Sequence, residues 1–162
     1  MKLARTFTAI MAITAVAACD DNGTGPDDSL EGSYTVSGFT YTPDSGGAGV
    51  NLAALTVLGC PCGILSMDVD SDNHFEGQLK YPGQDAMTIA GDIDTDGNQI
   101  TIDFDEATET TAGLEDESGT FTTTSSGGLT ITLPEVTFDF RPFGGEGPDE
   151  PATLVIVAAE ID

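Results

Sequence analysis

The chain has 162 residues, of which 28 are acidic and 4 are basic, so its formal net charge is −24. This acidic excess excludes nucleic-acid binding through the phosphate backbone, because that mode requires clustered Lys and Arg side chains. The length suits one domain with a hydrophobic core. With 20 Gly, 8 Pro and no Trp, the composition favours frequent turns over long helices. We therefore expect an all-β domain.

The first residues have the layout of a secretory signal peptide. Lys2 and Arg5 precede an uncharged, largely apolar run over residues 6–18, and Cys19 then begins an abruptly acidic stretch. The run is shorter than the roughly 20 apolar residues that a membrane-spanning helix needs. We therefore interpret residues 1–18 as a signal peptide that is removed from the mature protein.

The junction itself is more specific. The segment Val16-Ala17-Ala18-Cys19 resembles the lipobox of bacterial lipoproteins, in which the cysteine becomes the lipid-modified first residue. The resemblance implies that Cys19 is lipidated and anchors the protein to a membrane of a bacterial cell envelope, on the periplasmic side or at the cell surface. In the alternative interpretation, Cys19 is an ordinary cysteine that follows the cleavage site.

The mature chain divides into a tether and a folded domain. Residues 20–29 have no apolar side chain to bury, so we assign residues 19–31 to an acidic flexible tether. From residue 30 onward, apolar residues recur mostly at every second position, the period of a strand with one buried face. Residues 32–162 are therefore predicted to form the β domain.

The predicted strands follow one another as hairpins. In the first strand, around Tyr34 and Val36, the apolar phase shifts across Gly38, which indicates a β-bulge. The strands that follow pair residues 65–69 with 75–81, residues 87–93 with 100–104 across an Asp96-Gly97 turn, and residues 121–123 with 129–133 across a turn at 125–128. Acids on these strands should face water and the aromatic residues should face inward. The last strand, residues 152–161, is apolar on both faces and should be covered on both sides.

About eight strands in sequential hairpins favour an antiparallel up-and-down barrel, because closure removes the exposed sheet edges. A β-sandwich is the alternative fold. The segment Gly32-Ser33-Tyr34 resembles the Gly-x-Trp opening of the lipocalins, with Tyr in place of Trp. The resemblance implies a lipocalin-like barrel. Residues 50–58, rich in Ala and Leu and followed by Gly59 and Pro61, are predicted to form one short helix between the first two strands.

A lipocalin-like barrel implies a small hydrophobic ligand in its interior. The candidate lining residues share an aromatic or Met side chain on the predicted inward face: Phe39, Tyr41, Met67, Phe75, Tyr81, Met87, Phe104 and Phe121. In the alternative, the same side chains only fill the core. The protein would then be a structural or protein-interaction module of the envelope that presents acidic loops, residues 105–117 and 143–151, to a protein partner.

An acidic segment is the strongest candidate for a metal site. Asp92, Asp94 and Asp96 precede Gly97, and Asp103 stands at the twelfth position, which matches most of the calcium-loop template. The twelfth ligand is usually Glu, however, and strands flank the segment where helices should. We therefore favour a plain hairpin turn over a Ca²⁺ site, and we predict no other cofactor.

The cysteine pair Cys60-Pro61-Cys62 leaves three possibilities: a disulfide across one residue, half of a metal site, or two free thiols. We favour the disulfide, because disulfides persist outside the cytoplasm. His74 is the sole histidine and is expected to be a solvated strand residue. Without a Gly-x-Ser-x-Gly motif, paired metal-binding histidines or a phosphate-binding loop, the sequence predicts a protein that is not an enzyme.

Overall fold

The structure is a computed structural model that describes residues 30–54, 60–136 and 151–161. The predicted signal peptide, the lipobox with Cys19 and the tether up to residue 29 lie outside these residues. Within them, no helix is long and apolar enough to cross a membrane.

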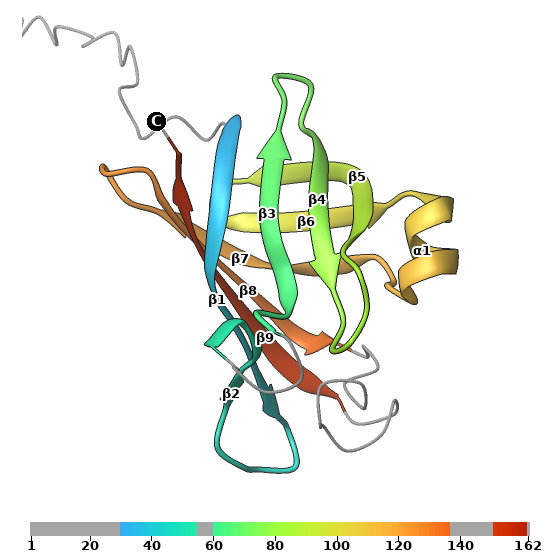
Figure 1. Cartoon of the computed structure of the whole chain (residues 1–162). Helices are drawn as coiled ribbons and strands as arrows, with labels where there is room; N and C mark the ends of the chain where they lie inside the picture. The colour runs from blue at the N-terminus through green and yellow to red at the C-terminus, as the bar shows by residue number, and fades with distance from the viewer. Residues whose placement is uncertain (1–29, 55–59, 137–150, 162) are drawn as a thin grey trace, which may run out of the picture.

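The described residues form one antiparallel sheet that closes into a barrel. Its strands are β1 (Gly32–Pro43), β2 (Val50–Asn51), β3 (Gly63–Val69), β4 (His74–Lys80), β5 (Met87–Asp96), β6 (Gln99–Phe104), β7 (Glu117–Thr123), β8 (Gly128–Val136) and β9 (Ala152–Glu160). Consecutive strands from β3 to β9 pair with one another, and β1 pairs with both β3 and β9, which closes eight strands into a ring (Figure 1). The short β2 is added beside the end of β1. The predicted up-and-down barrel is confirmed, and the β-sandwich is wrong.

Strand β1 contains the predicted bulge. Its pairing register with β9 shifts between Val36 and Gly38. Because of this extra residue, the buried positions change from Tyr34 and Val36 before the bulge to Phe39 and Tyr41 after it. The hairpins that follow also have the predicted turns: Asp96 pairs with Gln99 across a two-residue loop, in which Gly97 has a φ of 62° that glycine adopts without strain.

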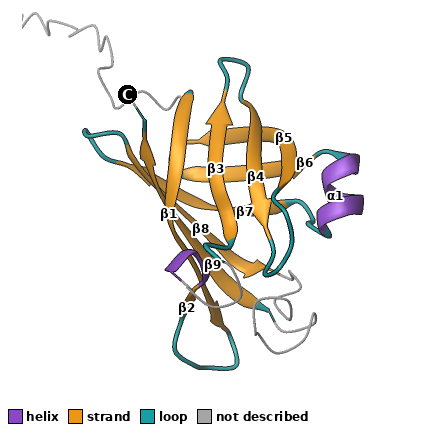
Figure 2. Cartoon of the chain, in the orientation of Figure 1, coloured by secondary structure: helices purple, strands orange, loops and turns teal. Residues whose placement is uncertain are grey.

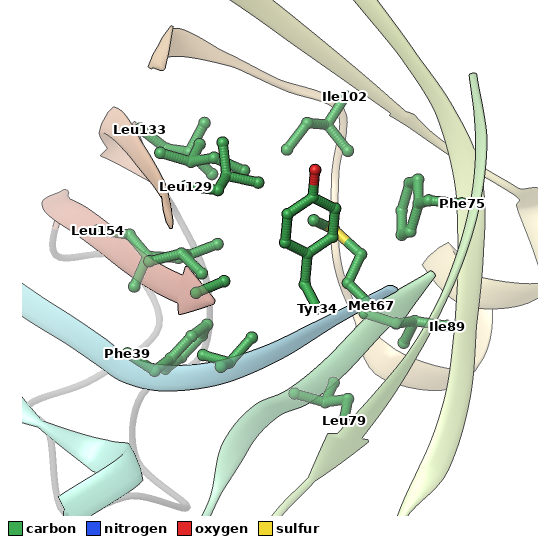
Figure 3. Packing of buried hydrophobic residues seen from close by; sticks show 14 of the residues in the cluster. Tyr34, Phe39, Met67, Phe75, Leu79, Ile89, Ile102, Leu129, Leu133 and Leu154 are labelled. Atoms are coloured by element: carbon green, nitrogen blue, oxygen red, sulfur yellow. The ribbon is translucent and has the colours of Figure 1, made fainter. Parts of the chain in front are cut away.

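The interior of the barrel is apolar, as the alternating pattern predicts. Buried aliphatic and aromatic side chains from all eight barrel strands converge there, and Figure 3 shows Phe39, Met67 and Phe75 among them. Acidic residues on the same strands, such as Asp68 and Asp92, are exposed on the outer face. The burial of this apolar surface is the main contribution to the stability of the fold.

Two inward-facing glycines allow neighbouring strands to pass very close to each other. A Cβ atom at Gly91 in β5 would collide with the carbonyl oxygen of Asp103 in β6. A Cβ atom at Gly119 in β7 would likewise collide with the carbonyl oxygen of Thr132 in β8. These backbone contacts require glycine, because backbone atoms inside a sheet cannot move aside as a flexible side chain can.

The predicted helix over residues 50–58 is wrong within its described part, and residues 55–59 lie outside the described residues. Residues 50–51 form strand β2, and Leu52–Ala54 form a single 3₁₀ turn. The Asn51 side chain explains the difference, since its Oδ1 accepts hydrogen bonds from the backbone N–H of Phe39 at 3.2 Å and of Ala53 at 3.1 Å. These bonds hold the segment against β1 and replace a helical first turn.

The α-helix of the described residues lies elsewhere, in the segment predicted to be an acidic loop. Helix α1 (Glu106–Ala112) lies outside the barrel beside β5 and β6 (Figure 2). It ends at Gly113, whose φ of 67° is the left-handed conformation typical of a helix C-cap.

The two ends of the domain also differ from expectation. Strand β9 is not covered on both faces in the described part of the chain, because Val157 on its outer face is 39% exposed. At the other end, Leu30 was assigned to the tether, but it is buried in the core with 1% exposure. Its carbonyl oxygen accepts a hydrogen bond from the Tyr34 hydroxyl at 3.1 Å. The packed structure therefore includes Leu30.

Helix α1 docks on the barrel through Thr108, which is 5% exposed. Its Oγ1 accepts a hydrogen bond from the backbone N–H of Ala90 at 2.9 Å and donates one to the carbonyl oxygen of Ala90 at 3.1 Å. These backbone groups of β5 lie just outside the pairing with β6, which begins at Gly91. The Ala90 carbonyl oxygen also accepts a hydrogen bond from the backbone N–H of Asp105 at 3.0 Å, so it is for the Ala90 N–H that the Thr108 hydroxyl takes the place of a strand partner.

We expect Thr108→Val to lower the free energy of unfolding by about 1–2 kcal/mol, because it keeps the side-chain shape but leaves the backbone N–H of Ala90 without its partner. Urea denaturation measures the change. Thr111→Val is the matched control, since Thr111 lies on the same helix and is exposed. Equal losses in the two variants would contradict the proposed docking role.

Candidate functional site

A cavity of about 50 Å³ lies in the barrel interior, and its walls are mostly apolar. This volume has room for roughly three or four water molecules. Ordinary small-molecule sites measure roughly 300–1,000 Å³. Side chains thus fill most of the described barrel interior around this cavity.

Half of the predicted ligand-binding residues line this cavity. Phe39, Met67, Phe75 and Phe104 form part of its wall. The rings of Phe75 and Phe104 meet edge to face, with centroids 5.8 Å apart. The other four predicted residues are not brought to the cavity: Tyr41, Tyr81 and Phe121 are buried elsewhere in the core, and Met87 is half-buried against it.

One corner of the cavity is closed without strand pairing. Strand β6 pairs with β5 only from Gly91 to Asp96, so the first part of β5 has helix α1 beside it instead. After the helix, residues 113–116 lead into β7, and Gly113, Leu114 and Glu115 form part of the cavity wall. We call residues 113–116 the connecting segment. Residues 113–116 belong to no strand, so this corner of the cavity is closed without the hydrogen-bond ladder of a paired strand.

Glu117, the first residue of β7, brings a carboxyl group to this corner. It pairs in register with Ile102 of β6, which is 5% exposed and faces inward. Residues directly opposite on antiparallel strands share a face, so the Glu117 side chain is also directed inward, and Glu117 lines the cavity. Burial, with the charges of Glu115 and Asp116, raises the pKa of the half-buried Glu117 carboxyl to about 7.

Glu117 is not among the residues predicted from the sequence, because it lies at the end of the segment predicted to be an acidic loop. A signal was available: buried Phe121 and Gly119 recur at every second position, and the same period reaches Glu117. An acid in phase with a buried apolar face is unusual, since ionisable residues are seldom buried without a partner.

A hydrogen bond attaches the connecting segment to the outside of the barrel. The Asp116 carboxylate accepts a hydrogen bond from the backbone N–H of Phe104 at 3.0 Å. The charge of Asp116 and its hydrogen bond to Asp103 raise the pKa of the exposed Asp103 carboxyl. Asp103 and Asp116 are therefore paired carboxyl groups on the outer surface, on the opposite face of the sheet from Glu117.

The candidate calcium residues form the favoured hairpin. Asp92 pairs across the strands with Asp103, Asp94 pairs with Thr101, and Asp96 pairs with Gln99 next to the turn. Within residues 30–54, 60–136 and 151–161, no group of three or more His, Cys, Asp or Glu residues is arranged to hold a metal ion.

His74 lies partly exposed on the outer surface, as expected, with Nδ1 2.9 Å from Oδ1 of Asp92. This hydrogen bond raises the pKa of the imidazole. The bond links β4 to β5 on the solvent side and takes no part in the interior cavity.

Cys60 and Cys62 are joined by a disulfide, the favoured one of the three possibilities, with their Cα atoms 4.6 Å apart. Cys62 is fully buried. The next residue, Gly63, has a φ of 93°, and a Cβ atom there would lie 2.6 Å from the ring of Phe39. The disulfide and this glycine together fix how the chain enters β3, directly beside a residue of the cavity wall.

The cavity, the inward carboxyl of Glu117 and the weakly paired corner together form the candidate site. This arrangement can bind an apolar group and present one acid to a polar end of the same molecule. No protein-family model matches the chain, and a comparison with curated proteins finds no significant match.

Proposed function

We propose that this protein is a lipid-anchored lipoprotein of a bacterial cell envelope that binds a small hydrophobic molecule in its barrel without converting it chemically. The observation that carries the proposal is the apolar cavity whose corner is closed by the connecting segment and not by a paired strand. The lipobox-like segment that ends at Cys19 supports the anchor.

The size of the cavity limits what it can accept. About 50 Å³ suits a short apolar group, and a larger molecule requires the connecting segment to move outward. Side-chain contacts that hold this corner include the hydrogen bond from the Phe104 N–H to Asp116 and the one from the Tyr81 hydroxyl to the carbonyl oxygen of Ala112 at 2.7 Å. Entry at this corner breaks fewer hydrogen bonds than separating two paired barrel strands would.

A second candidate function follows from the same small volume. If the core is simply filled, the barrel is a structural or protein-interaction module of the envelope, and its acidic outer surface meets a protein partner. Helix α1 supports this candidate, because it is an exposed element with acidic residues in its first turn, Glu106 and Glu109.

Native mass spectrometry of the full-length protein from its own host separates the two functions. A retained small molecule of defined mass supports the binding function and identifies the ligand. A protein that is empty, and stays empty after exposure to a lipid extract of the host, contradicts it and favours the interaction module. Crosslinking to envelope proteins is then the next experiment.

We expect Cys19→Ser to move the protein from the membrane fraction to the soluble fraction, because each buried methylene of an acyl chain contributes about 0.8 kcal/mol of membrane affinity. Immunoblots of fractionated cells measure the change. Ser29→Ala is the control, since it changes a nearby residue of the predicted tether but leaves Cys19 in place. If the Cys19→Ser protein stays with the membranes, the lipoprotein proposal is wrong.

A further inference from the structure

We infer that the molecule bound in the cavity carries a protonated amine beside its apolar part, and that the amine pairs with the carboxylate of Glu117. This inference rests on the proposed binding function and adds the chemical class of the ligand. It follows from the position of the inward-facing Glu117, from the charges around it, and from the apolar character of the rest of the described cavity wall.

The position of Glu117 gives the cavity one polar side. The ionisable residues that line it in the described chain are Glu115 and Glu117. Glu115 is exposed, whereas Glu117 is half-buried and faces inward opposite Ile102. A ligand that fills the cavity therefore meets apolar side chains on its other sides and a carboxyl group at the corner near the connecting segment.

The surrounding charges favour a cation over an anion. The charged groups that act on Glu117 from the connecting segment are Glu115 and Asp116, both acidic. On β6, the residues that face the cavity with Glu117 are the apolar Ile102 and Phe104. The acid of this strand, Asp103, lies on the outer face and is hydrogen-bonded to Asp116. The whole chain has a formal charge of −24, so its field attracts cations and repels anions.

The ligand must also replace the water that it displaces from the carboxylate. Within the described residues, no side-chain hydrogen bond or ion pair to the Glu117 carboxyl is present. A carboxylate that loses water without gaining a partner is costly, whereas an ammonium group supplies both charge and hydrogen-bond donors. An alcohol of the same length supplies one hydrogen bond and no charge.

The proposed ion pair makes binding depend on pH. Because the pKa of Glu117 is raised to about 7, much of this carboxyl is protonated in the empty protein at about pH 6, and binding of an ammonium group must release that proton. Alkylamines stay protonated well above neutral pH, like the Lys side chain. Amine affinity should therefore rise between about pH 6 and about pH 8, while the affinity for a neutral alcohol should not.

The test uses the full-length protein in lipid nanodiscs with three probes of equal chain length, hexylamine, 1-hexanol and hexanoate. Calorimetric titrations at about pH 6 and about pH 8, in about 0.15 M salt to screen surface charges, give each Kd after subtraction of empty nanodiscs. We expect hexylamine to bind at least about tenfold more tightly than hexanol at the higher pH, which corresponds to the free energy of one partly buried charge pair. Hexanoate should bind most weakly.

Glu117→Gln should remove the preference for hexylamine over hexanol, and binding of hexanol to the variant shows that the variant keeps its cavity. Glu109→Gln is the matched control, because it removes the same charge from an exposed position on α1. The control should keep the preference for the amine. If Glu117→Gln does not fold, the pH dependence of the amine-to-alcohol ratio in the unmodified protein still tests the inference.

The possible failures have different meanings. Equal binding of hexylamine and hexanol at both pH values overturns the amine inference, but the proposed binding function stands. Tightest binding of hexanoate overturns it in the same way. If none of the probes binds to the unmodified protein, the proposed binding function fails as well.

Discussion

Gly91→Ala and Gly119→Ala should each lower the free energy of unfolding by at least about 3 kcal/mol, among the largest effects of any single methyl group in this protein. At both positions the added Cβ would collide with the backbone carbonyl oxygen of the neighbouring strand, Asp103 or Thr132. To avoid this collision, β5 must move away from β6, or β7 from β8. Each separation lengthens the hydrogen bonds between the strands and opens the core.

Urea denaturation of the two variants beside Gly47→Ala measures this effect. Gly47 is the control, because a Cβ atom there would have no heavy atom within 4 Å and its φ is not in the left-handed region. Its substitution should change the free energy of unfolding by less than about 0.5 kcal/mol. Wild-type stability in Gly91→Ala would mean that β5 and β6 do not pass as closely as described.

The stability of the protein should fall as pH rises from about 4.5 to about 7, by about 1–2 kcal/mol through Glu117 alone, because solvent screening at this half-buried position weakens the effect. Burial and two neighbouring acids raise the pKa of this carboxyl from an ordinary value of 4.5 to about 7 in the folded state. In that window the folded protein keeps a proton that the unfolded chain releases, so folding is favoured at the acidic end and this contribution is lost as pH rises through 7.

Comparison with Glu117→Gln isolates the contribution of this group. Urea denaturation at about pH 4.5, 6 and 8 should show a flatter dependence in the variant, because Gln keeps the neutral form at every pH. The raised pKa of Asp103 acts in the same direction, but both proteins share it and it cancels in the difference. Parallel curves would show that the Glu117 carboxyl titrates as it does in the unfolded chain.

The barrel could be predicted from the sequence because each strand shows its buried face locally. Alternation in the β5 and β6 segments, with Gly97 at the turn, is sufficient to define a hairpin and its inward face. The bulge at Gly38 was visible for the same reason, since one extra residue inverts the alternation.

The helix positions could not be predicted in this way. Residues 50–58 have good helix formers, but a long-range hydrogen bond from Phe39 to the side chain of Asn51 favours an extended start. Helix α1 has a polar, Thr-rich sequence that local propensity does not favour, and its contacts to Ala90 and Tyr81 lie far away in sequence. Tertiary contacts thus determine the backbone conformation of residues 50–54 and of α1.

The candidate site was only partly predictable. Alternation shows which face of a strand a residue occupies, but it does not show the position of that residue along the barrel axis. The sequence therefore could not distinguish Phe39 and Phe75, which line the cavity, from Tyr41 and Phe121, which are buried elsewhere in the core. The inward direction of Glu117 depends on its register with Ile102, which only the assembled sheet defines.

The ring of strands is completed by the pairing of β1 with β9, the barrel strands that lie farthest apart in the chain. Ser37 and Val157, which share a hydrogen bond at this seam, are 120 residues apart in the chain. Hairpins with local contacts can form early, but such a distant pairing carries a large loop-closure cost and slows folding. Until β9 pairs with them, β1 and β8 have open edges that can pair with other chains, so the folding polypeptide is most prone to aggregation just before the ring closes.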